Sequence, residues 1–155
     1  IFYMGISFGG GIGALALPWD RRICRAHLNV PTFGHQPLRL QLPTVGSAAS
    51  QQRFVREHGH VLETLAYYDA GSAARLIEQP THVAAALFDP SVAPPTHFAI
   101  YNALAGPKQL FLLATGHAEN PARTAQDFNL LQALKRFFCA DEPRVPPLAE
   151  SASWP

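Results

Sequence analysis

Cysteine, charge and long apolar segments are all scarce in this sequence of 155 residues. Its two cysteines, Cys24 and Cys139, cannot form a disulfide framework, and we interpret them as buried or free thiols. Charged residues make up 15% and the net charge is +1, without a basic run, so we expect no nucleic-acid partner and no membrane partner. The uncharged segment 1–19 contains five glycines and meets Pro18 near its end, which makes it a poor membrane span.

The sequence does contain enough apolar material for the core of one domain, since hydrophobic residues make up 48% of it. Apolar runs predict strands at 1–4, 23–30, 83–88 and 110–114, and the last two have the continuous hydrophobicity of strands buried on both faces. Helical patterns alternate with them at 10–17, 47–57, 61–68, 70–77, 94–104 and 120–138. The alternation predicts an α/β fold with a parallel sheet over residues 1–138, followed by a flexible tail at 139–155.

Local signals predict where several of these segments begin. Ser47 and Asp69 are candidate N-caps, and Asn120 precedes Pro121 in the pattern of a strong helix start. Several prolines and glycines without periodicity predict a loop over 32–46. In the last helix one stripe of apolar residues predicts the buried face: Phe128, Leu131, Leu134 and Phe138.

The segment Gly5-Ile6-Ser7-Phe8-Gly9 stands between a short apolar run and a helix of small residues. This is the context of a nucleophile elbow, in which a sharp strand-to-helix turn holds a serine hydroxyl out above the sheet. We expect glycine at both flanking positions because strand and helix approach too closely there for a side chain. A glycine-rich turn without catalytic function is the alternative, because the motif is short and glycine is common.

Three polar residues each follow the carboxyl end of a predicted strand: Ser7, Asp89 and His117. In an open parallel sheet this edge is where active sites form, and the order Ser, Asp, His is that of α/β-hydrolases. His117 would take the proton of Ser7, and Asp89 would orient the imidazole. The backbone N–H of Phe8 would be one oxyanion-hole donor. The sequence therefore predicts a serine hydrolase that needs no cofactor and no metal.

Other polar residues have simpler explanations. His58 and His60 lack the third ligand of a zinc site, so we interpret them as a polar helix end. His27 ends a strand and could face the site, although a core or surface histidine is the simpler interpretation for it and for His35, His82 and His97. Asp69 is the second choice for the triad acid, after its capping role.

Four segments match a known family: Gly5–Gly10, Thr64–Asp69, the run from Leu87 to Asn102 with Asp89, Pro94, Pro95, Phe98 and Tyr101, and Gly116–Glu119. Together they make residues 1–138 resemble the carboxyl-terminal half of the acetyl xylan esterase / cephalosporin C deacetylase family of α/β-hydrolases. Two positions depart from the family pattern. Phe8 replaces a glutamine, and Ala118 separates His117 from Glu119.

The resemblance implies an α/β-hydrolase fold and removal of acetyl groups from a small acetylated sugar or similar alcohol. It also implies a homo-oligomer, a hexamer in the full-length protein, and favours the cytoplasm, although the compartment cannot be read from the sequence. Because elbow strands lie inside their sheets, we expect amino-terminal strands to be missing and this segment alone to be nearly inactive. A peptidase or dienelactone-hydrolase-like enzyme of the same fold, or an inactive fragment, are the alternatives.

Overall fold

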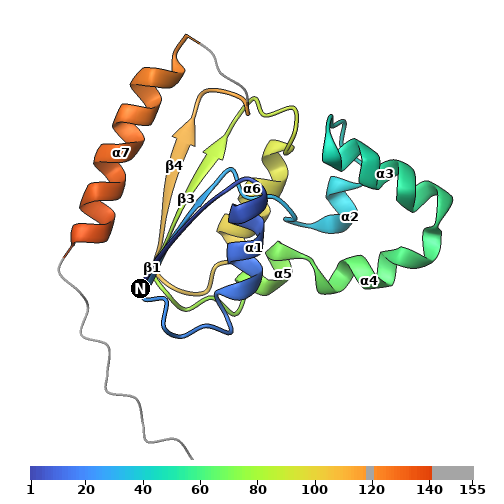
Figure 1. The fold of residues 1–155 in the computed structure, drawn as a ribbon, viewed down its shortest axis with the longest axis horizontal. Helices are drawn as coiled ribbons and strands as arrows, with labels where there is room; N and C mark the ends of the chain where they lie inside the picture. Colours follow the sequence, from blue (N-terminus) through green and yellow to red (C-terminus); the bar gives the residue numbers. More distant parts are fainter. Residues whose placement is uncertain (118–120, 141–155) are drawn as a thin grey trace, which may run out of the picture.

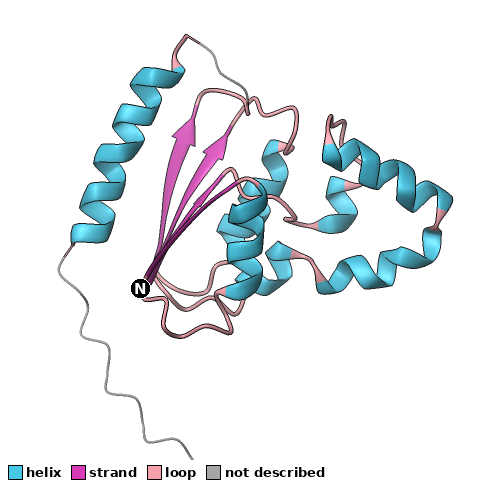
Figure 2. Ribbon diagram, viewed as in Figure 1, coloured by secondary structure: helices cyan, strands magenta, loops and turns pink. Residues whose placement is uncertain are grey.

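The computed structural model of the protein describes residues 1–117 and 121–140, which form a parallel β-sheet with helices on both faces (Figure 1, Figure 2). The described strands pair in the order β1 (Phe2–Ile6), β2 (Arg25–Asn29), β3 (Thr81–Ala86) and β4 (Lys108–Leu113). Every pairing is parallel. All four carboxyl ends therefore meet at one edge of the sheet, as the sequence predicts.

Helices divide the core into two layers. On one face lie α1 (Phe8–Ala16), α5 (Ala70–Ala74) and α6 (Pro94–Ala103), and on the other lies α7 (Arg123–Cys139) (Figure 1). The first core includes Leu17, Leu28, Ile77 and Val83, all fully buried. The second includes Val30, Leu113, Leu130 and Leu134 beneath α7. Alternation along the strands produces this division, since Val83 and Ala84 point to opposite faces of β3.

An arm of short helices projects from the sheet between β2 and α5 (Figure 1). It consists of α2 (Gln36–Arg39), α3 (Ser47–Glu57), the 3₁₀ turn η1 (Gly59–Val61) and α4 (Leu62–Tyr67). The predicted loop over 32–46 is wrong where α2 forms, because proline starts this helix and the ring of His35 accepts the Leu38 N–H at its N-terminus. The predicted Ser47 cap is also wrong. Gly46, at φ 67°, is the N-cap, and Ser47 is the first helical residue.

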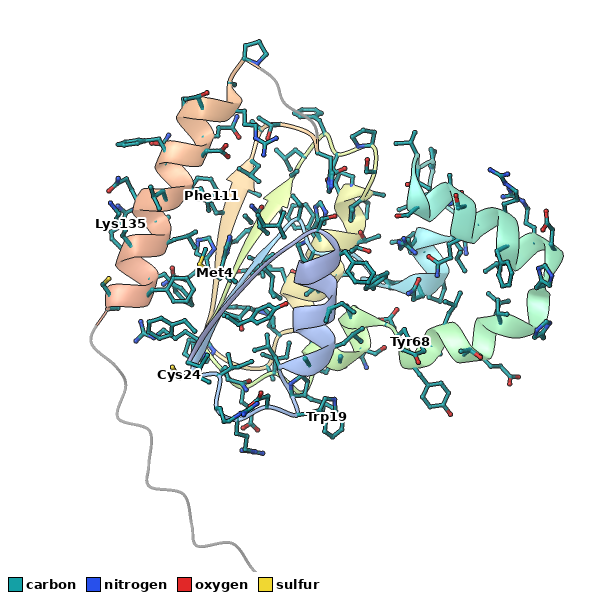
Figure 3. All side chains as sticks on the ribbon, in the orientation of Figure 1. Met4, Trp19, Cys24, Tyr68, Phe111 and Lys135 are labelled. Carbon is teal, nitrogen blue, oxygen red and sulfur yellow. The ribbon has the colours of Figure 1, made fainter. Side chains whose placement is uncertain are left out.

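The prediction of buried strands is wrong for the two outer strands of the described sheet, β1 and β4. All six residues of β3 are buried, but most of β4 is exposed, because β4 is an edge of the described sheet. On β1 the side chains of Phe2, Met4 and Ile6 are 49%, 60% and 66% exposed, since this strand is the other described edge. Figure 3 shows Met4 on β1 and Phe111 on β4, whose ring packs against the core under α7.

The predicted buried stripe of α7 is confirmed in part, since Leu134 is buried and Phe138 packs against the core. Phe128 and Leu131 are exposed, while Leu130, Leu134 and Phe137 are buried against the sheet. Within the described residues the helix begins at Arg123, and the predicted cap Asn120 lies outside them. Among the described helices none is long and apolar enough to cross a membrane.

Candidate active site

Ser7 forms the turn between β1 and α1 with a backbone that is unusual for a serine. Its φ is 52° and its ψ is −113°, outside the regions that residues with a side chain normally adopt. Three backbone hydrogen bonds hold it. The Ser7 N–H donates to the Asn29 carbonyl at 2.8 Å, and the Ser7 carbonyl accepts from Gly11 N–H at 3.0 Å and Thr32 N–H at 3.2 Å. Such strain persists only where the surroundings fix it, which is the physical signature of an elbow.

The two glycines of the motif have different environments. A Cβ on Gly5 would lie 2.5 Å from the Gly9 carbonyl oxygen, so strand and helix do approach too closely there for a side chain. A Cβ on Gly9 would meet nothing within 4 Å, and the expectation for that position is wrong. Another close approach is at Gly10, where a Cβ would lie 2.9 Å from Pro31 Cα. The helix therefore crosses near Pro31 with Gly10, not Gly9, at the contact.

Asp89, which is buried, and His117, which is partly exposed, form a pair beyond the ends of β3 and β4. The His117 Nδ1 lies 2.6 Å from Asp89 Oδ2, and the carboxylate side chain is completely buried. Asp89 Oδ1 accepts the backbone N–H groups of Ser91 at 2.8 Å and Val92 at 2.9 Å. The loop thus fixes the carboxylate, and the carboxylate orients the imidazole with its Nδ1 turned inward and its Nε2 free to face away.

Ser7 and His117 line one cavity of about 370 Å³ with Phe8, Thr32, Phe33, Arg39, Gly46, Ser47, Gln51, Ser91 and Val92. The hydrogen bonds of the described residues do not include one from Ser7 Oγ to His117, and such bonds often tighten only when substrate binds. Phe8 is the first residue of α1, where its N–H has no acceptor within the helix. Its ring packs edge-on against Phe33, 5.4 Å between centroids.

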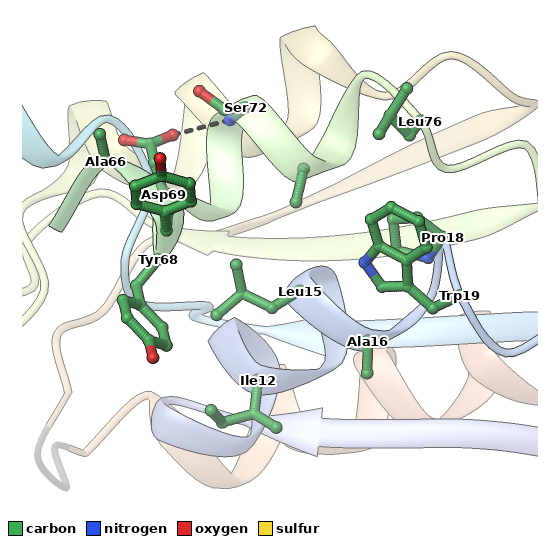
Figure 4. A pocket seen from close by; sticks show the side chains of 12 residues that line it. Ile12, Leu15, Ala16, Pro18, Trp19, Ala66, Tyr68, Asp69, Ser72 and Leu76 are labelled. Atoms are coloured by element: carbon green, nitrogen blue, oxygen red, sulfur yellow. Dashed lines mark hydrogen bonds between the residues drawn. The ribbon is translucent and has the colours of Figure 1, made fainter. Parts of the chain in front are cut away.

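Asp69, the second choice for the triad acid, serves the backbone instead. Its Oδ1 accepts the Ser72 N–H at 2.7 Å, which confirms the predicted cap of α5, and its Oδ2 accepts the Gln36 N–H. A larger apolar cavity of about 510 Å³ lies beside it, between α1 and the α4–α5 segment. Figure 4 shows Trp19, Tyr68 and Leu76 around this cavity, which none of Ser7, Asp89 and His117 lines.

His27 and His82 lie in the core under α7, away from the cavity that Ser7 and His117 line. Their Nδ1 atoms are 3.0 Å apart, and His82 packs against Phe137. Burial lowers the pKa of each to about 4, so both are neutral at pH 7. The core interpretation of both is therefore confirmed. No group of three or more potential metal ligands occurs within the part of the chain that the structure describes.

Arg39 is a cavity residue that the sequence analysis missed, because it lies in the segment expected to be a loop. It is only 5% exposed, and burial lowers its pKa. A signal was present in the sequence. Between Arg25 and Arg53 the sequence has no aspartate, glutamate or lysine, and Arg39 is its one arginine. A single charge in a long uncharged segment is a reason to ask what it contacts.

Comparison with known proteins assigns the family. The model of the acetyl xylan esterase (AXE1) family matches residues 1–134. The chain belongs to this family. Among solved structures, the acetyl xylan esterase from Paenibacillus sp. R4 superposes with a TM-score of 0.74 at 29% sequence identity, over 86% of this chain and 45% of that one. The comparison with curated proteins found no match.

More distant structures share the fold of this acetyl xylan esterase family member. Acetyl xylan esterase 1 from Thermoanaerobacterium sp. JW/SL YS485 has a TM-score of 0.70 at 20% identity, over 86% of this chain and 45% of that one. An acylaminoacyl peptidase from Pyrococcus horikoshii has a TM-score of 0.75 at 12% identity, over 94% of this chain and 24% of that one. The chain has the α/β-hydrolase fold, and it spans about half the length of the two acetyl xylan esterases.

Proposed function

We propose that the protein is a serine esterase that removes acetyl groups from acetylated sugars or related alcohols. The observation that carries the proposal is the 2.6 Å pair of His117 and buried Asp89, which shares one sheet edge with the strained Ser7. Membership of the acetyl xylan esterase family supports the substrate class. The mechanism is derived from the positions of these three side chains.

The Asp89 carboxylate accepts the Nδ1–H of His117, which leaves Nε2 as the proton acceptor. Nε2 would take the Ser7 proton as Oγ attacks the acetyl carbonyl, and the Phe8 N–H would stabilise the oxyanion. The protonated His117 then gives its proton to the departing alcohol, and an acetyl-enzyme remains. Water attacks this ester with His117 again as base, and releases acetate with Ser7 restored.

A serine-directed fluorophosphonate probe tests the nucleophile. We expect labelling of the full-length protein at Ser7, and loss of labelling in Ser7→Ala. Ser47 lines the same cavity and provides a matched control, because Ser47→Ala should leave the labelling unchanged. Substitution Ser7→Ala or His117→Ala should lower turnover of p-nitrophenyl acetate by several orders of magnitude, roughly as in other serine hydrolases. Labelling that survives Ser7→Ala would refute the assignment.

A further inference from the structure

Arg39 is a buried cation in the catalytic cavity, and no described residue is its acidic partner. It ends α2, is 5% exposed, and lines the cavity that Ser7 and His117 also line. None of the ion pairs among the described residues includes it. Its Nε is buried and has no hydrogen-bond partner. Charged side chains are rarely buried without a partner, because removing them from water is costly.

The contacts that Arg39 does make are weak for a buried charge. Its Nη1 donates to the Gln36 side-chain oxygen at 3.4 Å, and its guanidinium lies 5.5 Å from the centre of the Phe33 ring. A guanidinium remains protonated in proteins, so it contributes a permanent positive charge. The described residues that line the cavity include no aspartate or glutamate. Among the described lining residues, Arg39 therefore supplies a fixed positive charge that no carboxylate neutralises.

The backbone around Arg39 is anchored from several sides. Its N–H donates to the His35 carbonyl at 3.0 Å, and its carbonyl accepts from the Gln52 side chain of α3 at 3.1 Å. The first residue of α2, Gln36, donates its N–H to buried Asp69. Because the backbone that carries it is held in place, the Arg39 side chain loses little conformational entropy when it binds an anion. A group that determines specificity requires this.

We propose that Arg39 forms an anion subsite of the catalytic cavity, and that the natural substrate carries a carboxylate. The subsite deepens the proposed function and rests on it. Because the transferred group is acetyl, which has no place for a charge, the carboxylate belongs to the alcohol part of the ester. The planar guanidinium has the geometry that binds a carboxylate through paired hydrogen bonds. The substrate class is the acetyl ester of an acidic alcohol, such as a sugar acid.

Two matched model esters test the charge alone. Acetoxybenzoate carries a carboxylate on the leaving group, and acetoxybenzamide replaces it with a neutral amide of nearly the same shape. We expect the full-length protein to prefer the benzoate by about 10- to 100-fold in kcat/KM, as for a charge-assisted hydrogen bond. The preference should be seen with the meta or the para isomer. Arg39→Met should abolish this preference, and Arg39→Lys should retain part of it. The preference is a ratio of two rates, so it can be measured even where a substitution lowers the turnover of both esters.

Two controls separate a subsite from a structural role. Gln51 lines the same cavity without a charge, so Gln51→Ala should change kcat/KM for both esters by the same factor. A cation kept for substrate costs stability in the free protein, so Arg39→Met should not lower the melting temperature. A lower melting temperature together with an unchanged ester preference would show that Arg39 is structural and would overturn the proposal.

The remaining outcomes distinguish this proposal from the proposed function. Hydrolysis of both esters at equal rates by the wild-type protein would overturn the subsite and leave the esterase assignment intact. If neither ester is hydrolysed, isothermal titration of the Ser7→Ala variant with benzoate decides. If Ser7→Ala binds benzoate and the double variant with Arg39→Met does not, the subsite is supported even though no esterase activity is seen. Equal binding with and without Arg39, or no binding, overturns it.

Discussion

Substitution by alanine should change the stability of the protein in opposite directions at the two glycines of the elbow motif, Gly5 and Gly9. In Gly5→Ala the new Cβ would lie 2.5 Å from the Gly9 carbonyl oxygen and 2.6 Å from its carbon, and these backbone atoms cannot move without displacing α1. Overpacking of this kind costs about 1–3 kcal/mol. In Gly9→Ala the Cβ enters open space within α1, where alanine is favoured over glycine by up to about 1 kcal/mol.

Thermal unfolding measures the difference. For a chain of this size about 1 kcal/mol corresponds to about 2–4 °C, so Gly5→Ala should lower the melting temperature by about 2–12 °C. Gly9→Ala should raise it by up to about 4 °C. Turnover of p-nitrophenyl acetate should fall only in Gly5→Ala, because displacement of α1 moves Ser7. A Gly9→Ala variant that is as destabilised as Gly5→Ala would refute the view that, of these two glycines, only Gly5 is constrained by space.

Three further predictions concern the core and the site. Burial lowers the pKa of His27 and His82 to about 4, against about 6.5 in the unfolded chain, so the unfolded chain binds more protons between these values. The free energy of unfolding should therefore fall from pH 6.5 towards pH 4, and it should fall less steeply in His82→Phe. Urea unfolding at several pH values measures this. Wild-type and His82→Phe proteins whose unfolding free energies fall in parallel with pH would contradict the prediction. Asp89→Asn should reduce turnover by about 10⁴-fold, by analogy with serine proteases. Asp69→Asn keeps a capping side chain, so it should change turnover only slightly. An equal loss of turnover in the two variants would contradict the choice of Asp89 as the triad acid. Because Phe8 lines the cavity next to Ser7, p-nitrophenyl esters with acyl chains longer than propionate should be hydrolysed poorly. Phe8→Gln should widen the range of acyl chain lengths that are hydrolysed. A wild-type preference for octanoate over acetate would contradict the acetyl specificity.

Much of the fold could be predicted because its signals are local. The continuous apolar run of β3 predicts a strand buried on both faces, and the structure confirms that burial. Asp69 caps α5 through its own nearby backbone, so that prediction also holds. Ser7, Asp89 and His117 follow β1, β3 and β4, and they lie at one sheet edge because every pairing in the described sheet is parallel.

Other features depend on which elements pack together, and the sequence could not supply them. The apolar runs of β1 and β4 resemble that of β3, but only the strand order makes them edges with exposed side chains. Phe128 fits a helical stripe as well as Leu130 does, and the sheet decides which of the two is buried.

At the site, the sequence by itself determined the residue types and their order along the chain, since strand ends, turns and caps are short-range chemistry. The tertiary structure alone decided that Gly5 and Gly10, not Gly9, lie where backbones nearly touch. It also decided that Arg39, a single charge in an uncharged segment, lies buried in the cavity of Ser7 and His117. Burial and close approach are properties of distant segments brought together, so they appear only when the sheet and its helices are assembled.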